Sequence, residues 1–216
     1  VTLVATGAGN DITLNGAVNG NAGTVTLTSP DTITQTATGL INTTGTLTGT
    51  AGGAATLDQA NTVADLGAVS ANGLTINDTT GGLTVSGTVT GGTGATSLTT
   101  AGGALAVGAN NVSGVGVSLT GVGVTSTGGT VDAGAGTILV DGNDGAISLA
   151  GALTTTNATA TAVRVIDGTT ASLGNITTGA GGTVTLGEAA GDNLSGAITQ
   201  TGVITTGTLN INGGST

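Results

Sequence analysis

The stretch GGLTVSGTVTGG, residues 81–92, contains the pattern that decides the fold of this chain. An aliphatic pair at i and i+2, Leu83 and Val85, is followed by Gly87 and, two residues later, by Val89. Alternating aliphatic residues are typical of a β-strand with one buried side, and a glycine after them is typical of a turn. The same unit recurs as Ile12, Leu14, Gly16, Val18 and as Ile147, Leu149, Gly151, Leu153.

Weaker copies of this unit keep only the glycine and the aliphatic residue that follows it. They are Gly39 with Ile41, Gly67 with Val69, Gly129 with Val131, Gly174 with Ile176 and Gly196 with Ile198, while Gly108 has only Val112 further on. The nine glycines step by about 20 to 28 residues, with a mean near 22, which lies in the range of solenoid repeats. Aliphatic-x-aliphatic segments form an independent second register with a mean step of about 23 residues, if the two longest intervals are each counted as two steps. They lie at 1–3, 25–27, 74–76, 117–119, 138–140, 163–165, 184–186 and 209–211.

Each copy holds three short stretches of alternating aliphatic residues, separated by Gly, Asn, Asp, Ser and Thr. Thr, Val and Ile favour strands, and frequent glycine disfavours helix. The sequence therefore predicts an all-β fold, a parallel β-helix (β-solenoid) of about nine coils of roughly 22 residues, with residues 1–216 as one continuous segment. Coils stacked at about 4.8 Å would make a rod on the order of 40 Å long.

The composition excludes several classes of function. The 216 residues include 44 glycines but no aromatic residue, cysteine, methionine or histidine, and Arg164 is the only basic side chain. The usual general bases, thiol nucleophiles and soft metal ligands are therefore absent. The net charge of −10 argues against nucleic-acid binding, and no apolar run approaches the roughly 20 residues of a membrane helix. We predict no catalytic, cofactor-binding or metal-binding residue.

Threonine alternates with aliphatic residues at 24–28 (TVTLT), 32–38 (TITQTAT) and 46–50 (TLTGT). The pleat of a strand then points the hydroxyls outward. Stacked rows of hydroxyls could match an ice lattice or hold a glycan, and ice binding needs a flat TxT pattern on one face of every coil. The copies 104–108 (ALAVG) and 117–123 (VSLTGVG) break that pattern, so we interpret the threonines as β-branched surface residues that keep the sheet soluble.

Acidic side chains raise the question of a divalent-cation site. The segment 7–16 (GAGNDITLNG) is similar to the glycine-rich nonapeptide of calcium-binding β-rolls, but it stands alone and has an extra residue before Leu14. We therefore interpret Asn10 and Asp11 as turn residues. A carboxylate ladder is the second candidate, but the registers of its members differ, which favours solvated corner charges. Its members are Asp78, Asp141, Asp167 and Glu188.

Arg164 supports one enzymatic hypothesis, because polysaccharide lyases and hydrolases on β-helices use acids and sometimes an arginine. Two carboxylates about 5 to 9.5 Å apart would suffice for glycosidase chemistry. Such enzymes also carry long cleft-forming loops and usually aromatic residues, which this sequence lacks. We instead interpret Arg164 as the partner of a nearby aspartate in a surface ion pair. The candidate acids are Asp132, Asp141, Asp144 and Asp167.

One copy of the repeat differs from the others in length. Between Gly39 and Gly67 the coil gains about six residues, and the stretch 57–66 (LDQANTVADL) is poor in glycine. We expect a corner loop or a short strand extension packed on the rod. Insertions with a function tend to lie on one face of a solenoid.

Three stretches carry a family resemblance: ANTVADLGAVSANGLTIND (60–78), GGLTVSGTVTGG (81–92) and the segment 138–187. They resemble the repetitive shaft of filamentous haemagglutinin-like proteins, very large adhesins that Gram-negative bacteria export by two-partner secretion or autotransporter routes. The resemblance covers nearly the whole chain. It implies a right-handed parallel β-helix, an extracellular or cell-surface location, and a structural or adhesive role. No secretion domain or anchor is recognisable, so we expect a segment of a longer repeat array.

These observations lead us to expect a non-enzymatic structural shaft of an extracellular bacterial fibre or adhesin, without a cofactor. Its expected partners are neighbouring repeats or further copies along the rod, because open apolar ends and unpaired strand edges favour head-to-tail association. A host-cell or surface glycan is a further expected partner. The alternative function is a binding module that uses outward threonine rows, and a polysaccharide-active β-helix enzyme is the third hypothesis.

Overall fold

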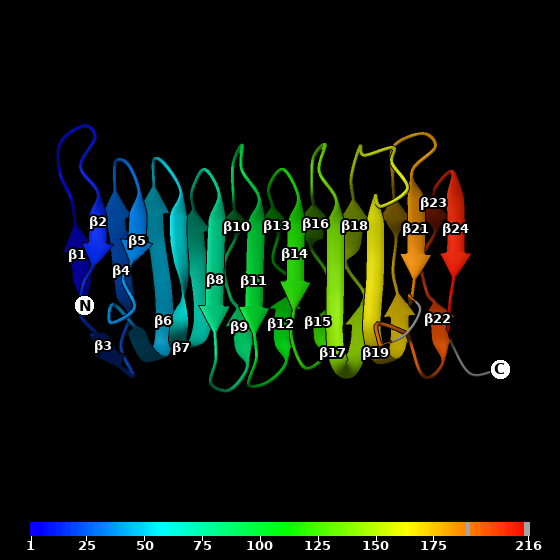
Figure 1. Ribbon diagram of the computed structural model, residues 1–216, viewed down its shortest axis with the longest axis horizontal. Coiled ribbons are helices and arrows are strands. Elements are labelled where there is room, and N and C mark those ends of the chain that lie inside the picture. Colours follow the sequence, from blue (N-terminus) through cyan, green and yellow to red (C-terminus); the bar gives the residue numbers. More distant parts are fainter. Residues whose placement is uncertain (189–190, 214–216) are drawn as a thin grey trace.

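The computed structural model of the protein describes residues 1–188 and 191–213 (Figure 1). The described residues form 24 strands and no helix, so no helix among them is long and apolar enough to cross a membrane. The strands pair in parallel with strands of the preceding and following coils. One series of register partners, each a coil further along the chain, consists of Ile12, Ile33, Ala55, Leu74, Thr96, Val117, Ile138, Val163, Val184 and Leu209. The predicted parallel β-helix is confirmed, with about nine coils of the predicted length.

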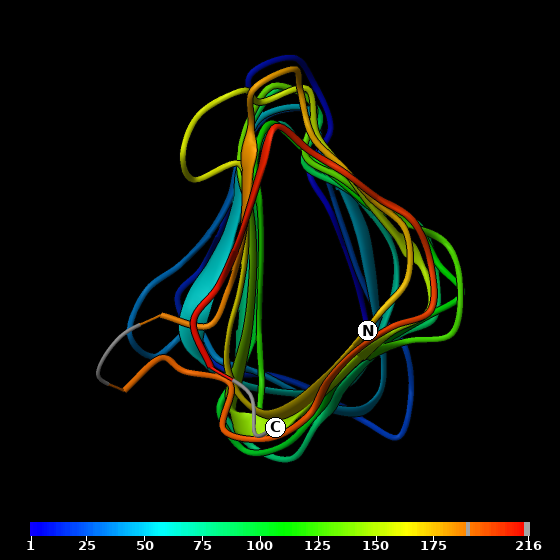
Figure 2. The same cartoon turned by 90° about the vertical axis from the view of Figure 1, so that its right-hand side faces the viewer.

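A view along the rod shows a roughly triangular outline, with the strands of successive coils stacked on three faces (Figure 2). We call these faces A, B and C. Four strands are long enough to pass a corner and to contribute to more than one face. They are β6 (Ile41–Ala51), β7 (Ala55–Ser70), β17 (Ile138–Leu149) and β19 (Val163–Leu173).

Face A contains the ends of β6 and β7 together with mostly short strands. These are β1 (Thr2–Val4), β4 (Val25–Ser29), β10 (Val89–Thr90), β13 (Val112–Ser113), β16 (Thr130–Asp132), β18 (Ala152–Thr154), β20 (Ile176–Thr177) and β23 (Ile204–Thr205).

Face B, which is toward the viewer in Figure 1, contains the beginnings of β7, β17 and β19. Its other strands are β2 (Ile12–Leu14), β5 (Ile33–Gln35), β8 (Leu74–Asp78), β11 (Thr96–Thr100), β14 (Val117–Thr120), β21 (Thr183–Leu186) and β24 (Thr208–Ile211). Face C contains the remaining parts of β6, β7, β17 and β19. It is completed by β3 (Val18–Asn21), β9 (Leu83–Val85), β12 (Leu105–Gly108), β15 (Val124–Ser126) and β22 (Ile198–Gln200).

The core is a set of aliphatic columns that run along the rod. Each strand pairs in register with the next coil, so inward side chains stack on inward side chains of similar size. Burying one of these side chains contributes about 1.5 to 3 kcal/mol. A narrow core filled coil after coil by similar residues has no place for an aromatic ring. One column on face B reads Leu57, Ile76, Leu98, Leu119, Val140, Val165 and Leu186.

Glycine at the corners lets one coil pass closely over the previous one. A Cβ added to Gly151 would lie 2.3 Å from the carbonyl oxygen of Gly128, and one added to Gly39 would lie 1.8 Å from that of Leu14. Any side chain at these positions would displace the backbone of the neighbouring coil. The recurring glycines therefore mark close contacts between coils.

The insertion expected between Gly39 and Gly67 does not exist. These glycines precede strands on different faces, because Ile41 pairs with Val18 on face C whereas Val69 pairs with Val89 on face A. The three faces have interchangeable aliphatic patterns. The interval from Gly39 to Gly67 therefore joins two different corners and is longer than one coil, without any inserted residues. Residues 57–66 lie within β7, which is part of the coil itself on faces B and C. They are therefore neither a corner loop nor an extension packed on the rod.

The longer coils lie elsewhere. The register steps from Ile138 to Val163 and from Val184 to Leu209 both span more of the chain than the step from Val163 to Val184. The additional residues lie between β18 and β19 and between β21 and β22. Figure 2 shows the described parts of both segments, in yellow and orange, at the two edges of face B and projecting on the same side of the rod.

A buried polar column interrupts the aliphatic core where β7 and β8 meet. Asn61, Asp78 and Thr100 are register partners in successive coils, and each residue is at most 1% exposed. The Asn61 Oδ1 accepts hydrogen bonds from the backbone amide of Ile41 (2.9 Å) and from Gln35 Nε2 (2.6 Å). The Asn61 Nδ2 donates to the carbonyl oxygens of Leu57, Gln59 and Asn77, each at 3.0 Å.

Candidate functional site

Outward hydroxyl groups form continuous rows along the rod, as the alternation of threonine with aliphatic residues predicts. The longest row lies on face A and follows the register through nine successive coils. All but one of its members carry a hydroxyl, and the exception is Asp132. We call it row 2; it consists of Thr28, Thr50, Ser70, Thr90, Ser113, Asp132, Thr154, Thr177 and Thr205.

A second row, which we call row 1, lies two residues earlier in each strand of face A. The residue between the two rows points inward, as shown by the burial of Val89 and Leu153. Each coil therefore presents an x-aliphatic-x segment with both flanking side chains outward; the only exception is Gly49, which takes the aliphatic position in one coil. Row 1 consists of Thr26, Thr48, Ala68, Thr88, Asn111, Thr130, Ala152, Asn175 and Val203.

The objection that ALAVG and VSLTGVG break a TxT face is wrong for face A, because neither segment lies there. ALAVG forms β12 on face C. VSLTGVG begins with β14 on face B. There Ser118 follows Ser97 in one outward row, and Thr120 follows Thr99 in a second outward row. The interruptions on face B come later. Leu139 and Arg164 follow Ser118 in register.

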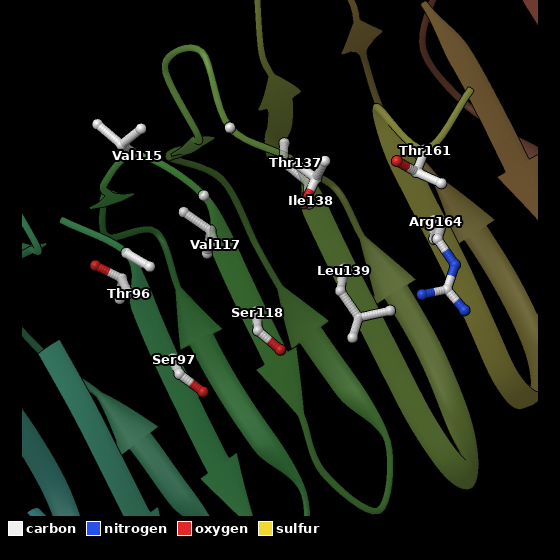
Figure 3. A pocket seen from close by; sticks show the side chains of 13 residues that line it. Thr96, Ser97, Val115, Val117, Ser118, Thr137, Ile138, Leu139, Thr161 and Arg164 are labelled. Carbon is white, nitrogen blue, oxygen red and sulfur yellow. The ribbon is translucent and has the colours of Figure 1, made fainter. Parts of the chain in front are cut away.

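Face B also contains a groove with a volume of about 620 Å³. Figure 3 shows Ser97, Ser118, Leu139 and Arg164 on neighbouring strands along its floor, with Thr161 beside Arg164. The thirteen lining residues include hydroxyls and one guanidinium but neither a carboxylate nor any other general base. These lining residues alone cannot supply the acid and base pair of a glycosidase.

Arg164 forms its ion pair with Glu188 and not with the predicted aspartates. Its Nε and Nη2 atoms lie 2.5 Å and 2.6 Å from the two carboxylate oxygens, and the side chains are 29% and 34% exposed. The hydrogen bonds from Arg164 lower the pKa of Glu188, and those to Glu188 raise the pKa of Arg164. The pair joins β19 to the residues that follow β21. Asp141, Asp144 and Asp167 are nearer to Arg164 in sequence than Glu188 is. Glu188 lies in the next coil, shortly after Thr185, the register partner of Arg164.

Asp141 and Asp144 in β17 and Asp167 in β19 lie near one another, and Asp192, between β21 and β22, lies near them. Desolvation is the main cause that raises the pKa of Asp167, and the negative charges of Asp144, Asp141 and Asp192 raise it further. Asp132, in contrast, lies on face A. No group of three acidic side chains in the described part of the chain is placed to hold a metal ion.

The acidic residues considered for a carboxylate ladder do not stack on one another, since Asp78 is in register with Thr100 and Asp141 with Ile166. Asp78 is fully buried and is not a solvated corner charge. Its Oδ1 accepts from the backbone amide of Val63 and its Oδ2 from the Thr100 hydroxyl, each at 2.9 Å. Its place in the polar column explains its burial, since both oxygens are satisfied.

Asp11 and Asn10 take part in local contacts between the first coils. The Asp11 Oδ1 accepts from the backbone amide and the hydroxyl of Thr32, at 2.9 Å and 2.7 Å, and these bonds lower its pKa. Asn10 donates to the carbonyl of Thr6. This arrangement agrees with turn residues and brings no second acid to Asp11.

Two features of the structure were not predicted from the sequence. The polar column around Asn61 could not be recognised because a single buried asparagine leaves no repeating signal. The two rows of face A do leave one: the aliphatic residue after a corner glycine is followed directly by a hydroxyl or a carboxylate, as in GTVT (87–90), GTVD (129–132) and GALT (151–154).

No protein-family model matches this chain, and no curated protein or solved structure is similar to it at a significant level.

Proposed function

We propose that this chain is a rigid shaft segment of an extracellular bacterial fibre or adhesin and has no enzymatic role. The observation that carries the proposal is the unbroken parallel pairing of coils on three faces, from β1 at one end to β24 at the other. Every coil is held to its neighbours by backbone hydrogen bonds, so bending the rod requires many of them to distort together. The resemblance to haemagglutinin-like shafts supports the extracellular location.

Protease resistance supports the same role, because a surface fibre is exposed to proteases. Arg164 is the only residue after which trypsin can cleave. It lies within β19, which is paired on both sides, and the following Val165 is fully buried. Cleavage at this bond therefore requires opening of the rod.

A trypsin experiment tests the rod with a matched control. The folded chain should stay intact and should yield only the fragments 1–164 and 165–216 after unfolding in urea. The variant Ala160→Lys places a cleavage site in the exposed segment between β18 and β19 and should be cut in the native state. Cleavage of the unmodified chain at the same rate as the Ala160→Lys variant would contradict a rigid shaft.

The end coils support self-association as part of this proposal. Val1 is 52% exposed at one end and Ile211 is 55% exposed at the other, and one edge of each end strand has no partner among the described residues. Further repeats or a second copy can extend the sheets there. Negative-stain microscopy should show rods in multiples of one chain length. Particles of a single length at all protein concentrations would contradict association between copies.

The location is tested on intact cells of the source organism. Antibodies against the chain should label unpermeabilised cells or the secreted fraction. Labelling that requires permeabilised cells would contradict an extracellular shaft.

A further inference from the structure

We propose that face A binds ice. Backbone pairing spaces the coils at about 4.8 Å, and the two outward residues of one strand lie about 6.6 to 6.8 Å apart. Row 2 presents a hydroxyl or a carboxylate in each of its nine coils, over roughly 40 Å. Row 1 is made of threonine and asparagine, except at the apolar residues Ala68, Ala152 and Val203. At one end of row 1, the hydroxyls of Thr26 and Thr48 are 3.2 Å apart and share a hydrogen bond, so this pair is closer than the backbone spacing.

A rigid periodic array is suited to a partner that has its own lattice. A single weak contact contributes little to the binding affinity, but many contacts that form at the same time give a much higher combined affinity. The hydroxyls are fixed on paired strands, so little conformational entropy is lost when they bind. The oxygen lattice of ice repeats at distances close to both spacings of the array, and threonine offers it a hydroxyl together with a methyl group.

The charge of face A also favours ice over other partners. Asp132 is the only charged member of the two rows, although the chain as a whole has a net charge of −10. The partner is therefore expected to be uncharged. The described parts of the segments that lengthen the two long coils lie at the two edges of face B and project on the same side of the rod (Figure 2), which leaves face A accessible to a flat surface.

A polysaccharide fits face A less well than ice does. Sugar recognition usually relies on aromatic side chains and on a concave site that encloses the ring. The chain has no aromatic residue, and the hollow described on face A, around Thr50, Ser70 and Thr90, has a volume of only about 260 Å³. A flat solid with hydrogen-bonding groups at regular intervals remains the best complement.

Two tyrosine variants provide the test. Thr90 lies in the middle of row 2, with Ser70 and Ser113 beside it. Thr99 is its matched control on face B, since it is also half-buried and has Asn77 and Thr120 beside it. The purified full chain should shape ice crystals, show thermal hysteresis and become enriched in slowly grown ice. We expect Thr90→Tyr to reduce the enrichment about tenfold or more, which corresponds to about 1.4 kcal/mol, and Thr99→Tyr to leave it unchanged.

Circular dichroism and trypsin resistance show whether both variants keep the rod. Absence of ice shaping by the folded, unmodified chain would overturn the proposal and leave the shaft proposal intact. Equal losses in the two folded variants would overturn the assignment to face A. Binding to crystalline chitin or cellulose that is lost in Thr90→Tyr, without any effect on ice, would assign face A to a polysaccharide instead.

Discussion

Replacement of Asn61 by alanine should destabilise the rod far more than the same change at a surface asparagine. The variant Asn61→Ala removes the acceptor of the buried Ile41 amide and the donor to three carbonyl oxygens. Asn77→Ala is the control, because Asn77 is half-exposed and its side chain makes one hydrogen bond, of 3.2 Å, to the Asp58 carbonyl.

The expected magnitude follows from these groups. A buried donor or acceptor without a partner costs about 1 to 3 kcal/mol. Loss of the Ile41 bond together with weakened carbonyl contacts therefore lowers the free energy of unfolding by about 3 kcal/mol. Asn77→Ala should lower it by about 0.5 kcal/mol or less, as do most surface substitutions.

Urea unfolding followed by circular dichroism measures the difference between the two variants. Amide exchange at Ile41 provides a local measurement, because its rate should rise about a hundredfold in Asn61→Ala if the local opening free energy falls by about 3 kcal/mol. If both variants unfolded within about 0.5 kcal/mol of each other and the Ile41 amide kept its protection, the reasoning about the polar column would be refuted.

Three further predictions concern a corner and two groups of charges. Gly151→Ala places a Cβ 2.3 Å from a carbonyl oxygen of the preceding coil, whereas nothing lies within 4 Å of a Cβ at Gly16. Thermal unfolding should show that Gly151→Ala lowers the free energy of unfolding by about 2 kcal/mol or more and that Gly16→Ala does not lower it. The pKa of Glu188 is lowered by Arg164, so the pair stabilises the fold above pH 4.5, the ordinary pKa of the carboxyl group, and this stabilisation is lost as the pH falls below that value. Glu188→Gln should remove this pH dependence of the unfolding free energy, which amounts to about 1 kcal/mol or less. Urea titrations at several pH values measure it. The pKa of Asp167 is raised, so its charged form destabilises the fold above pH 3.8, its ordinary pKa. Asp167→Asn should therefore stabilise the fold by about 0.5 kcal/mol or less at pH 7. Identical stability of the variant and the unmodified chain at pH 7 in low salt would contradict repulsion between Asp167 and the neighbouring aspartates.

The repeat of the β-helix could be predicted because local patterns encode it. Leu83, Val85, Gly87 and Val89 show within one short stretch where strands alternate and where the chain turns. Short-range periodicity depends on neighbouring residues only, and a coil of about 22 residues repeats it often enough to be recognised.

The assignment of strands to faces could not be predicted from the same pattern. Gly39 and Gly67 look equivalent in sequence, yet they precede strands on different faces. An aliphatic-x-aliphatic segment fits any of the three faces equally well, so only pairing between coils distinguishes them. The partner of Arg164 was misassigned for the same reason, because contact along the rod joins residues that are a coil apart.

The sequence by itself determined the strands, the corners, the repeat length and the absence of the side chains that most enzymes need. These properties follow from local chemistry, namely the alternation of aliphatic residues and the positions of glycine. Only the tertiary structure decided that nine coils align row 2 on one nearly uncharged face, that Asn61 and Asp78 share a buried column and that Glu188 meets Arg164. Register between coils is set by packing between residues that are one whole coil apart in the chain, and no local pattern records which of three similar faces a strand will join.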